Sequence, residues 1–195
     1  MERLVKQIAF IKEIDKVKYI LRRTKLFDSD RRENDAEHSW HLAMLVMTLA
    51  EHANEPIDVC KTMKMVLIHD IVEIDTGDIF FFDTERSHDN TEEELKAAKR
   101  IFGMLPEDQA EEFLNLWIEF ETKDTPEARF ARAVDRLEPM LQNASNNGGT
   151  WQEFDVHYDA VLESKMGIDK SSKTIWEYIL KVLEESVERG ILKRD

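Results

Sequence analysis

LIHDIVEIDTGD, residues 67–78, sets ionisable side chains among aliphatic ones near the end of a helix predicted over residues 59–74. An ionised carboxylate in apolar surroundings is strongly disfavoured unless it is paired or bound to a metal. His69 and Asp70 are consecutive, so their side chains diverge by about 100° around a helix, and both can still reach one ion beside it. A lone His-Asp pair also fits an ordinary hydrogen-bonded core histidine, so further ligands are needed.

Further side chains of the metal-ligand type lie on other predicted helices. His38 belongs to a helix over residues 36–53 that follows Asp35, a suitable N-cap. Asp135 belongs to a helix over residues 126–145, which Pro139 is expected to kink or loosen. Two imidazoles and two carboxylates from three helices suit a divalent transition-metal ion with open positions for water.

The rest of the chain predicts an all-α fold. A first helix over about residues 3–22 is expected to bury one apolar stripe. No period-two strand is evident, and the segment RRTKLFDSDRREND, residues 22–35, reads as irregular. We expect one domain over residues 1–195, a helical bundle with its metal-site core over about residues 18–140 and its C-terminal helices packed on that core.

The other predicted elements follow from capping and turn signals. Residues 75–90 read as an ordered loop, Thr91 and Glu94 have capping-box spacing, and residues 143–150 contain the clearest break. Further helices are predicted over residues 91–104, after Pro106, around residues 151–165 and over residues 171–189.

Composition narrows the function. The formal net charge of −14 disfavours a nucleic-acid polymer as a partner, because such binding depends on lysine and arginine. A single cysteine, Cys60, excludes an intramolecular disulfide. The N-terminal segment alternates charged and apolar residues, unlike a signal peptide or a membrane span. We therefore expect a cytoplasmic protein that does not engage a membrane.

Three motifs together carry a family resemblance: EHSWH at residues 37–41, LIHDIVEIDTGD at 67–78 and ARAVDRLEP at 131–139. In this ordered set the chain resembles the His-Asp (HD) domain superfamily of metal-dependent phosphohydrolases, and more narrowly its 5′-deoxynucleotidase-like branch. The resemblance covers roughly residues 18–140 and implies an HD-type helical bundle. It also implies four metal ligands, which are His38, His69, Asp70 and Asp135.

Two acids acquire roles through this resemblance. Glu73 lies three residues after Asp70 and thus near the same helical face, from which it could activate a water for attack on phosphorus. The resemblance implies that Glu73 is a catalytic acid and that Asp78 is a second functional acid. Asp75 is an equally acidic neighbour, and the residues alone do not choose between Asp75 and Asp78.

One arginine is expected to bind phosphate. Arg23 precedes His38 by the spacing of a phosphate-contacting arginine in the nucleotidases, and a guanidinium can hold phosphate oxygens bidentately. Arg22 and Arg31 compete for this role. Nucleotidases with a strong preference for deoxyribose carry a bulky aromatic residue after that arginine, whereas this chain has Thr24, which leaves its sugar preference open.

Other conspicuous side chains receive no catalytic role. Glu37, Trp40 and His41 are interpreted as capping groups, core groups or groups that support the ligands. The run Phe80–Phe82 is more typical of a core or an interface, although a part in substrate closure or dimerisation stays open.

The leading hypothesis is hydrolysis of (deoxy)nucleoside 5′-monophosphates to nucleoside and phosphate by a metal-activated water, with one Mn²⁺, Co²⁺, Fe²⁺, Zn²⁺ or Ni²⁺ ion. An alternative keeps the metal and changes the nucleotide to a triphosphate, a cyclic dinucleotide or an alarmone. Another alternative is a non-enzymatic, metal-dependent nucleotide sensor. The family resemblance also implies a homodimer.

Overall fold

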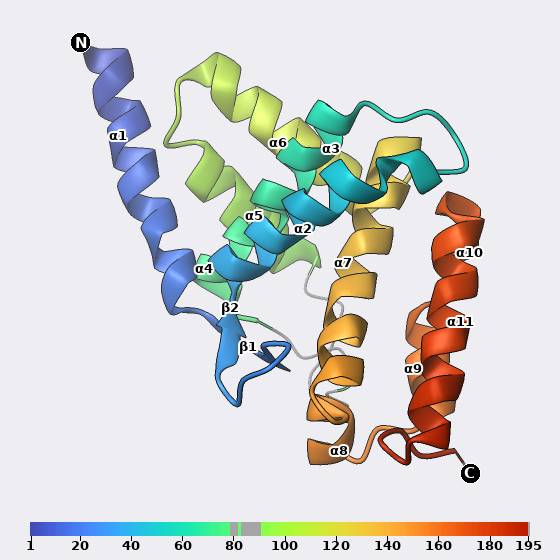
Figure 1. Cartoon of the computed structure of the whole chain (residues 1–195). Helices are drawn as coiled ribbons and strands as arrows, with labels where there is room; N and C mark the ends of the chain where they lie inside the picture. The colour runs from blue at the N-terminus through green and yellow to red at the C-terminus, as the bar shows by residue number, and fades with distance from the viewer. Residues whose placement is uncertain (79–81, 83–90, 195) are drawn as a thin grey trace.

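The computed structural model of the chain describes residues 1–78, 82 and 91–194. Helices form most of the regular structure in this part of the chain (Figure 1). The elements are α1 (Glu2–Ile14), the 3-10 helix η1 (Asp15–Tyr19), β1 (Leu21–Lys25), β2 (Arg32–Asn34), α2 (Asp35–Leu49), η2 (Ala50–His52), α3 (Val59–Ile68), η3 (His69–Val72), α4 (Glu73–Thr76), α5 (Thr91–Phe102), α6 (Glu107–Thr122), α7 (Pro126–Ser145), α8 (Gly149–Glu153), α9 (Tyr158–Ser164), α10 (Ile168–Ser171) and α11 (Lys173–Glu188).

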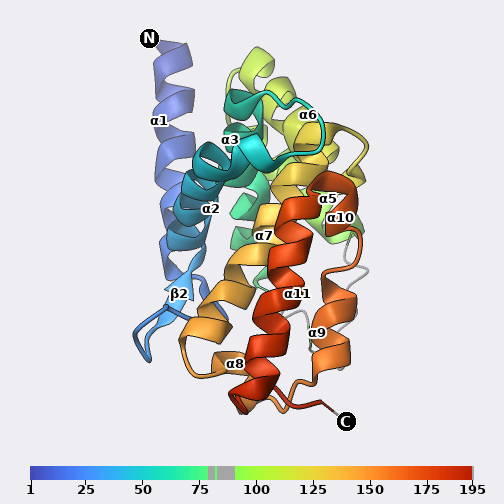
Figure 2. The same cartoon turned by 45° about the vertical axis from the view of Figure 1, so that its right-hand side comes forward.

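Helix α7 lies between two groups of helices and contacts both. It packs against α2, α3 and α6, and α10 and α11 contact it from another side (Figure 2). The buried apolar side chains form one cluster that extends along the chain from Phe10 to Leu192. The C-terminal helices therefore share the core that holds α2, α3 and α7, and the predicted helical bundle is confirmed.

The aliphatic stripe predicted for the first helix is buried only in part, because Ile14 and Val17 pack against the core. Phe10 is 4% exposed and meets the ring of Phe113 edge to face, with centroids 5.8 Å apart. Leu4, Ile8 and Ile11, which belong to the same aliphatic stripe, are exposed. Phe10 is the one residue of α1 that is fully buried, and its edge-to-face pair with Phe113 favours this face of the helix.

A short antiparallel hairpin replaces the end of the first predicted helix and the irregular segment after it. The α-helix ends at Ile14, one 3-10 segment follows, and β1 then pairs with β2. The prediction that the chain has no strand is wrong here, because two strands of five and three mainly polar residues show no clear alternation of hydrophobicity. The side chains of β1 alternate nevertheless, with Arg22 and Thr24 turned inward and Arg23 exposed.

The entry to α2 differs from the prediction by one residue. Asn34, not Asp35, is the N-cap: its side chain accepts from the backbone N–H of Glu37, and the Glu37 side chain accepts from that of Asn34. Glu37 therefore has the capping role expected of it. Asp35, which was predicted to cap the helix, lies instead in its first turn and is 1% exposed.

The segment that carries His69 and Asp70 is not one continuous helix. Helix α3 ends at Ile68, a 3-10 turn spans His69–Val72, and α4 resumes at Glu73. A glycine with φ of +74° ends α4 at residue 77, a conformation that other residues rarely adopt. The tighter turn changes the direction of side chains at positions where a regular α-helix was expected.

The later helices follow the prediction with shifted ends. Helix α7 starts at Pro126 behind the N-cap Thr125 and continues through Pro139 without a break in the assigned helix. The predicted break begins only after Ser145, and the helix expected around residues 151–165 is divided into α8 and α9. No helix in the described ranges has both the length and the apolarity to cross a bilayer.

Candidate active site

His38 reaches the centre of the bundle from the first turn of α2. It lies on the same face as Leu42 and Val46, which are fully buried, and is itself 0% exposed. Its Nε2 atom lies 3.1 Å from Oδ1 of Asp135, and its Nδ1 atom lies 3.2 Å from Oε2 of Glu138. Each ring nitrogen of His38 thus lies near a carboxylate of α7.

His69 has a defined tautomer. Its Nδ1 atom lies 2.9 Å from the carbonyl oxygen of Val66, and because a carbonyl only accepts, Nδ1 carries the hydrogen of the neutral ring. Among the described residues its buried Nε2 has no hydrogen-bond partner, although Oδ1 of Asp70 is 3.0 Å away and Oδ1 of Asp135 is 3.6 Å away. A ring nitrogen with a free lone pair facing two carboxylates is the arrangement that a cation stabilises.

The predicted ligand atoms converge. One donor atom from each of His38, His69 and Asp135 lies within 4.8 Å of the others, the spacing of a metal site. Asp70 lies at the edge of this group, with Oδ2 4.0 Å from Nε2 of His38. The donors are two nitrogens and carboxylate oxygens, as a divalent transition-metal ion prefers, so the residues present fit such an ion.

Of the three arginines considered for phosphate binding, Arg22 lies beside the site. Its Nη1 atom lies 2.9 Å from Oδ2 of Asp70 and 4.0 Å from Oδ1 of Asp78. The alternation of β1 leaves Arg23, the arginine expected from the motif spacing, on the exposed side. Arg31 pairs with Glu37 at 2.9 Å on the surface. The geometry therefore favours Arg22 among the three candidates, and a role for Arg23 stays a prediction.

A second group of acids lines the site next to Asp70. Asp35, Asp70 and Glu73 each place an oxygen within 4.8 Å of the others. Burial, together with the charge of Asp70, raises the pKa of Asp35 to about 7. Burial and the charges of Asp70 and Asp35 also raise the pKa of Glu73 well above its usual value, against the lowering effect of Arg22. Glu73 is thus a more basic carboxylate than an exposed one.

Asp75 and Asp78, between which the sequence did not decide, have different surroundings in the structure. Asp78 faces Arg22, and burial raises its pKa against the opposing effect of that guanidinium. Asp75 instead pairs with Arg100 through two contacts of 2.5 and 2.6 Å on the surface. Asp78 is therefore near the predicted metal ligands and Asp75 is engaged elsewhere.

Buried polar partners of His38 were not predicted. Glu138 is 0% exposed, and hydrogen bonds with His38 and His41 lower its pKa to about 2 despite its burial. Glu33 is also buried and accepts from Nε2 of Gln142 at 2.8 Å. One feature of the sequence could have indicated the role of Glu138. It lies three residues after Asp135, and this spacing puts both acids on one face of a helix. Nδ1 of His41 lies 3.2 Å from Oε1 of Glu138, so His41 contacts a residue that also contacts His38.

Other residues singled out in the sequence lie outside the ligand group. Thr24 is buried on the inner side of β1, the side toward which Arg22 also points. Trp40 is exposed. Phe80 and Phe81 lie outside the described residues, whereas Phe82 packs against the hydrophobic core.

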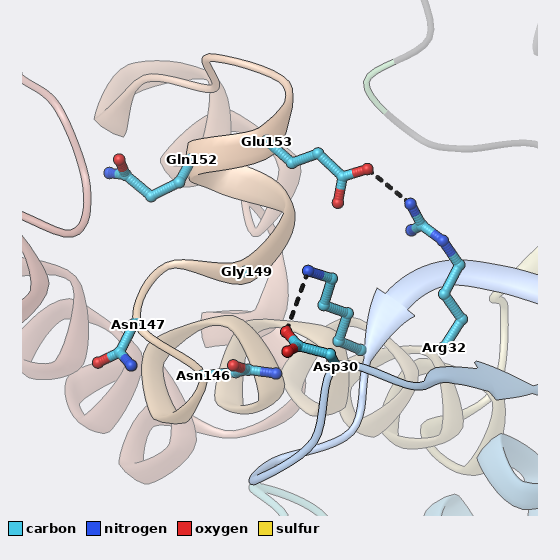
Figure 3. Close-up of a pocket in the computed structure, with 8 residues that line it drawn as sticks. Asp30, Arg32, Asn146, Asn147, Gly149, Gln152 and Glu153 are labelled. Carbon is cyan, nitrogen blue, oxygen red and sulfur yellow. Dashed lines mark hydrogen bonds and ion pairs between the residues drawn. The ribbon is translucent and has the colours of Figure 1, made fainter.

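A polar cavity of about 590 Å³ lies between the hairpin and the start of α8 (Figure 3). None of the predicted ligands lines it. Its charges are paired, with Lys25 3.5 Å from Asp30 and Arg32 2.6 Å from Glu153. This cavity is therefore separate from the predicted ligand group.

The chain is similar in sequence and in fold to known proteins. Among curated proteins, the 5′-deoxynucleotidase HDDC2 of Danio rerio is 27% identical over 161 residues, covering 80% of this chain and 76% of that protein. Its Bos taurus counterpart is 33% identical over 128 residues, covering 63% of this chain and 60% of that protein. A solved structure described as a predicted metal-dependent phosphohydrolase from Magnetospirillum magnetotacticum MS-1 is 48% identical, with a TM-score of 0.91 and full coverage of both chains.

The family model described as HD domain matches residues 14–176. This range includes β1 with Arg22, the turn with His69 and Asp70, and all of α7. The resemblance expected from the three motifs is confirmed. The chain therefore belongs to the HD domain family.

Proposed function

We propose that this hydrolase of the HD domain family converts deoxynucleoside 5′-monophosphates to nucleoside and inorganic phosphate, with one divalent metal ion held by His38, His69, Asp70 and Asp135. The observation that carries the proposal is the unpartnered Nε2 of buried His69, which faces two carboxylates. The names of the curated relatives support the substrate class. When bound, the ion would act as a Lewis acid toward the phosphoryl group.

The side chains around the ligands would bind the phosphate and transfer the proton of the attacking water. Arg22 would donate to phosphate oxygens and offset the negative charge that develops during attack. Glu73 would take the proton of the attacking water, since its burial among acids makes it a better proton acceptor. Asp78 would orient the guanidinium of Arg22, from which its carboxylate is 4.0 Å away. No covalent intermediate with the chain is needed.

The test is phosphate release across a matrix of nucleotides and metals. Deoxynucleoside and ribonucleoside mono- and triphosphates, cyclic dinucleotides and alarmones would each be incubated with Mn²⁺, Co²⁺, Fe²⁺, Zn²⁺, Ni²⁺ and Mg²⁺, and the products identified. Monophosphates should release phosphate with a transition-metal ion, and the ribose arm measures the sugar preference that Thr24 leaves open. Turnover of another nucleotide class alone would overturn the proposal. Binding without turnover anywhere would favour a sensor.

The assembly state is also a proposal. We infer a homodimer, and the exposed aliphatic side chains Leu4, Val5, Ile8 and Ile11 on α1 support it as a surface that a second copy could cover. Light scattering after size-exclusion chromatography tests this, with Ile8→Glu expected to yield monomers. A wild-type chain that elutes as a monomer at micromolar concentration would contradict it.

A further inference from the structure

Glu33 is a buried acid that the proposed reaction does not use. It lies in β2 and is 1% exposed. Its Oε1 atom accepts from Nε2 of Gln142 at 2.8 Å, whereas its Oε2 atom has no hydrogen-bond partner among the described residues. A buried carboxylate is costly unless a cation or several donors offset its charge. A cation held against Oε2 would therefore stabilise Glu33.

The hairpin places Arg22 next to this acid. In the antiparallel register of the two strands, Leu21 lies opposite Asn34. One position further into the hairpin, Arg22 and Glu33 are neighbours across the strands, and Nε of Arg22 lies 3.7 Å from Oε2 of Glu33. This Nε atom is also buried without a hydrogen-bond partner in the described part of the chain. An unused donor and an unused acceptor thus face each other.

His38 also lies near Glu33 but is not a cation when it binds a metal ion. Nδ1 of His38 is 3.4 Å from Oε2 of Glu33 and 3.2 Å from Oε2 of Glu138. An imidazole that binds metal through Nε2 is neutral and has one hydrogen to donate. Glu138 is the nearer acceptor, and its other oxygen faces His41. Arg22 is therefore the permanent charge that faces Glu33.

The two ends of the Arg22 guanidinium have different neighbours. Nη1 lies 2.9 Å from Asp70, 3.8 Å from Asp35 and 4.0 Å from Asp78, on the side of the proposed metal ligands. A phosphate bound at the ligand group would compete with these carboxylates for the Nη1 end. Nε faces Glu33, so this contact can persist while the other end of the guanidinium engages phosphate.

Helix α7 holds Glu33 in turn. Gln142, which donates to Glu33, is itself 1% exposed. It lies seven residues after Asp135 and four after Glu138, so all three side chains share one face of the helix. One face of α7 thus supplies a predicted metal ligand, a partner of His38 and a partner of Glu33.

We propose that Glu33 is a positioning residue for the phosphate-binding guanidinium of Arg22, and that Gln142 holds Glu33 in place. The inference rests on the proposed function, because it requires that Arg22 donates to phosphate. It assigns different partners to the two buried acids near His38. Glu138 orients the metal ligand, whereas Glu33 orients the arginine.

Titration of the Mn²⁺-loaded protein with inorganic phosphate, followed by calorimetry, tests this role together with steady-state kinetics on a deoxynucleoside 5′-monophosphate. Glu33→Gln should weaken phosphate binding by about 10-fold and lower kcat/KM by about 10- to 100-fold, because a displaced donor engages phosphate poorly. Glu33→Asp keeps the charge but shortens the side chain, and it should show losses of the same order. If Glu33 only offset the charge of Arg22, its neutralisation would strengthen phosphate binding. That result would overturn the proposal.

A double-mutant cycle in kcat/KM assigns the effect to Arg22. In an Arg22→Ala background, Glu33→Gln should change kcat/KM by less than about twofold, because the group that it positions is gone. An equal loss in both backgrounds would show that Glu33 acts elsewhere. The Mn²⁺ affinity of Glu33→Gln, measured by competition with a fluorescent chelator, should stay within about threefold of wild type. A loss as large as that expected for Glu138→Gln would make Glu33 a partner of His38 instead.

Glu153→Gln is the matched control, because Glu153 also pairs with an arginine of the hairpin, Arg32, at 2.6 Å but outside the ligand group. It should change each quantity by less than about threefold. Thermal melts identify any variant that does not fold. Gln142→Met then provides a second test from α7, with an expected loss of kcat/KM of about 3- to 10-fold that disappears in the Arg22→Ala background.

The outcomes separate this inference from the proposed function. Wild-type turnover that Glu33→Gln and Gln142→Met leave unchanged would overturn only the positioning role. Absence of turnover by wild type would contradict the proposed function, and the phosphate titration would still measure the effect of Glu33 on anion binding. Absence of phosphate binding to the Mn²⁺-loaded wild type would overturn the positioning role as well.

Discussion

Nη1 of Arg22 lies 2.9 Å from Oδ2 of Asp70, so a strand near the N-terminus supplies the cation beside a predicted metal ligand that follows α3. Arg23, its neighbour in β1, faces the other side of the strand. Successive side chains of a strand point in opposite directions, and one position therefore separates an arginine in the site from one at the surface.

This pair of arginines provides a matched test. Arg22→Ala should lower kcat/KM for a nucleoside monophosphate by about 100-fold, the usual loss when a donor to a developing charge is removed. Arg23→Ala should change it by less than about threefold, as expected for an exposed side chain. Steady-state kinetics of both variants, with metal content measured in parallel, decide the matter. A larger loss of kcat/KM for Arg23→Ala than for Arg22→Ala would assign phosphate binding to Arg23, as the motif spacing predicts.

Glu73 is predicted to act on the proton and not to hold the metal. Glu73→Gln should reduce kcat by about 100-fold or more, in the range for a lost general base, with metal content near that of wild type. Asp75→Asn is the control, because Asp75 pairs with Arg100 on the surface, and its kcat should stay within about threefold. Loss of metal from the Glu73 variant would instead make Glu73 a ligand.

Glu138 is predicted to orient His38. Its Oε2 lies 3.2 Å from Nδ1 of His38, and a carboxylate there favours the tautomer that leaves Nε2 free for an ion. Glu138→Gln should weaken metal affinity by about 10- to 100-fold, measured by competition with a fluorescent chelator. Glu153→Gln, an exposed acid of α8, should leave the affinity unchanged. Equal affinities for all three proteins would show that Glu138 is only structural.

The stability of the metal-free protein should depend on the charge of Lys165. Because the pKa of this lysine falls from 10.5 to about 8 on folding, the unfolded chain binds more protons between these values, and the free energy of unfolding rises with pH there. Lys165→Met should remove a penalty on the order of 3 kcal/mol at pH 7. Thermal melts should show a higher Tm for the variant at pH 7 and a smaller difference near pH 10. A difference that does not vary with pH would contradict the prediction.

The ligands proposed from the sequence share one property. Each is an ionisable side chain that can be recognised from the sequence of its own helix. His38, His69, Asp70 and Asp135 are polar side chains set in apolar helical patterns, and such a pattern indicates a partner or an ion before any distance is known. The three motifs that contain these residues resemble the HD domain superfamily, and that resemblance predicted an HD-type bundle. Convergence itself had to come from the structure, because sequence spacing does not say how helices pack.

Other features were hidden because they depend on tertiary contacts. The hairpin of β1 and β2 is too short and polar to show a period of two, so the inward direction of Arg22 was not foreseen. Phe10 decides the buried face of α1 through Phe113, a partner about a hundred residues later. Asp35 reads as a typical N-cap, yet Asn34 takes that position and Asp35 becomes buried. Local propensity is a weak guide where packing decides.

The central claim is that four side chains hold one divalent ion, and anomalous diffraction from crystals grown with Mn²⁺ or Zn²⁺ tests it most directly. The account predicts one strong peak per chain, about 2.0–2.2 Å from Nε2 of His38, Nε2 of His69 and carboxylate oxygens of Asp70 and Asp135. No peak among these atoms, or a peak held by other residues, would contradict it.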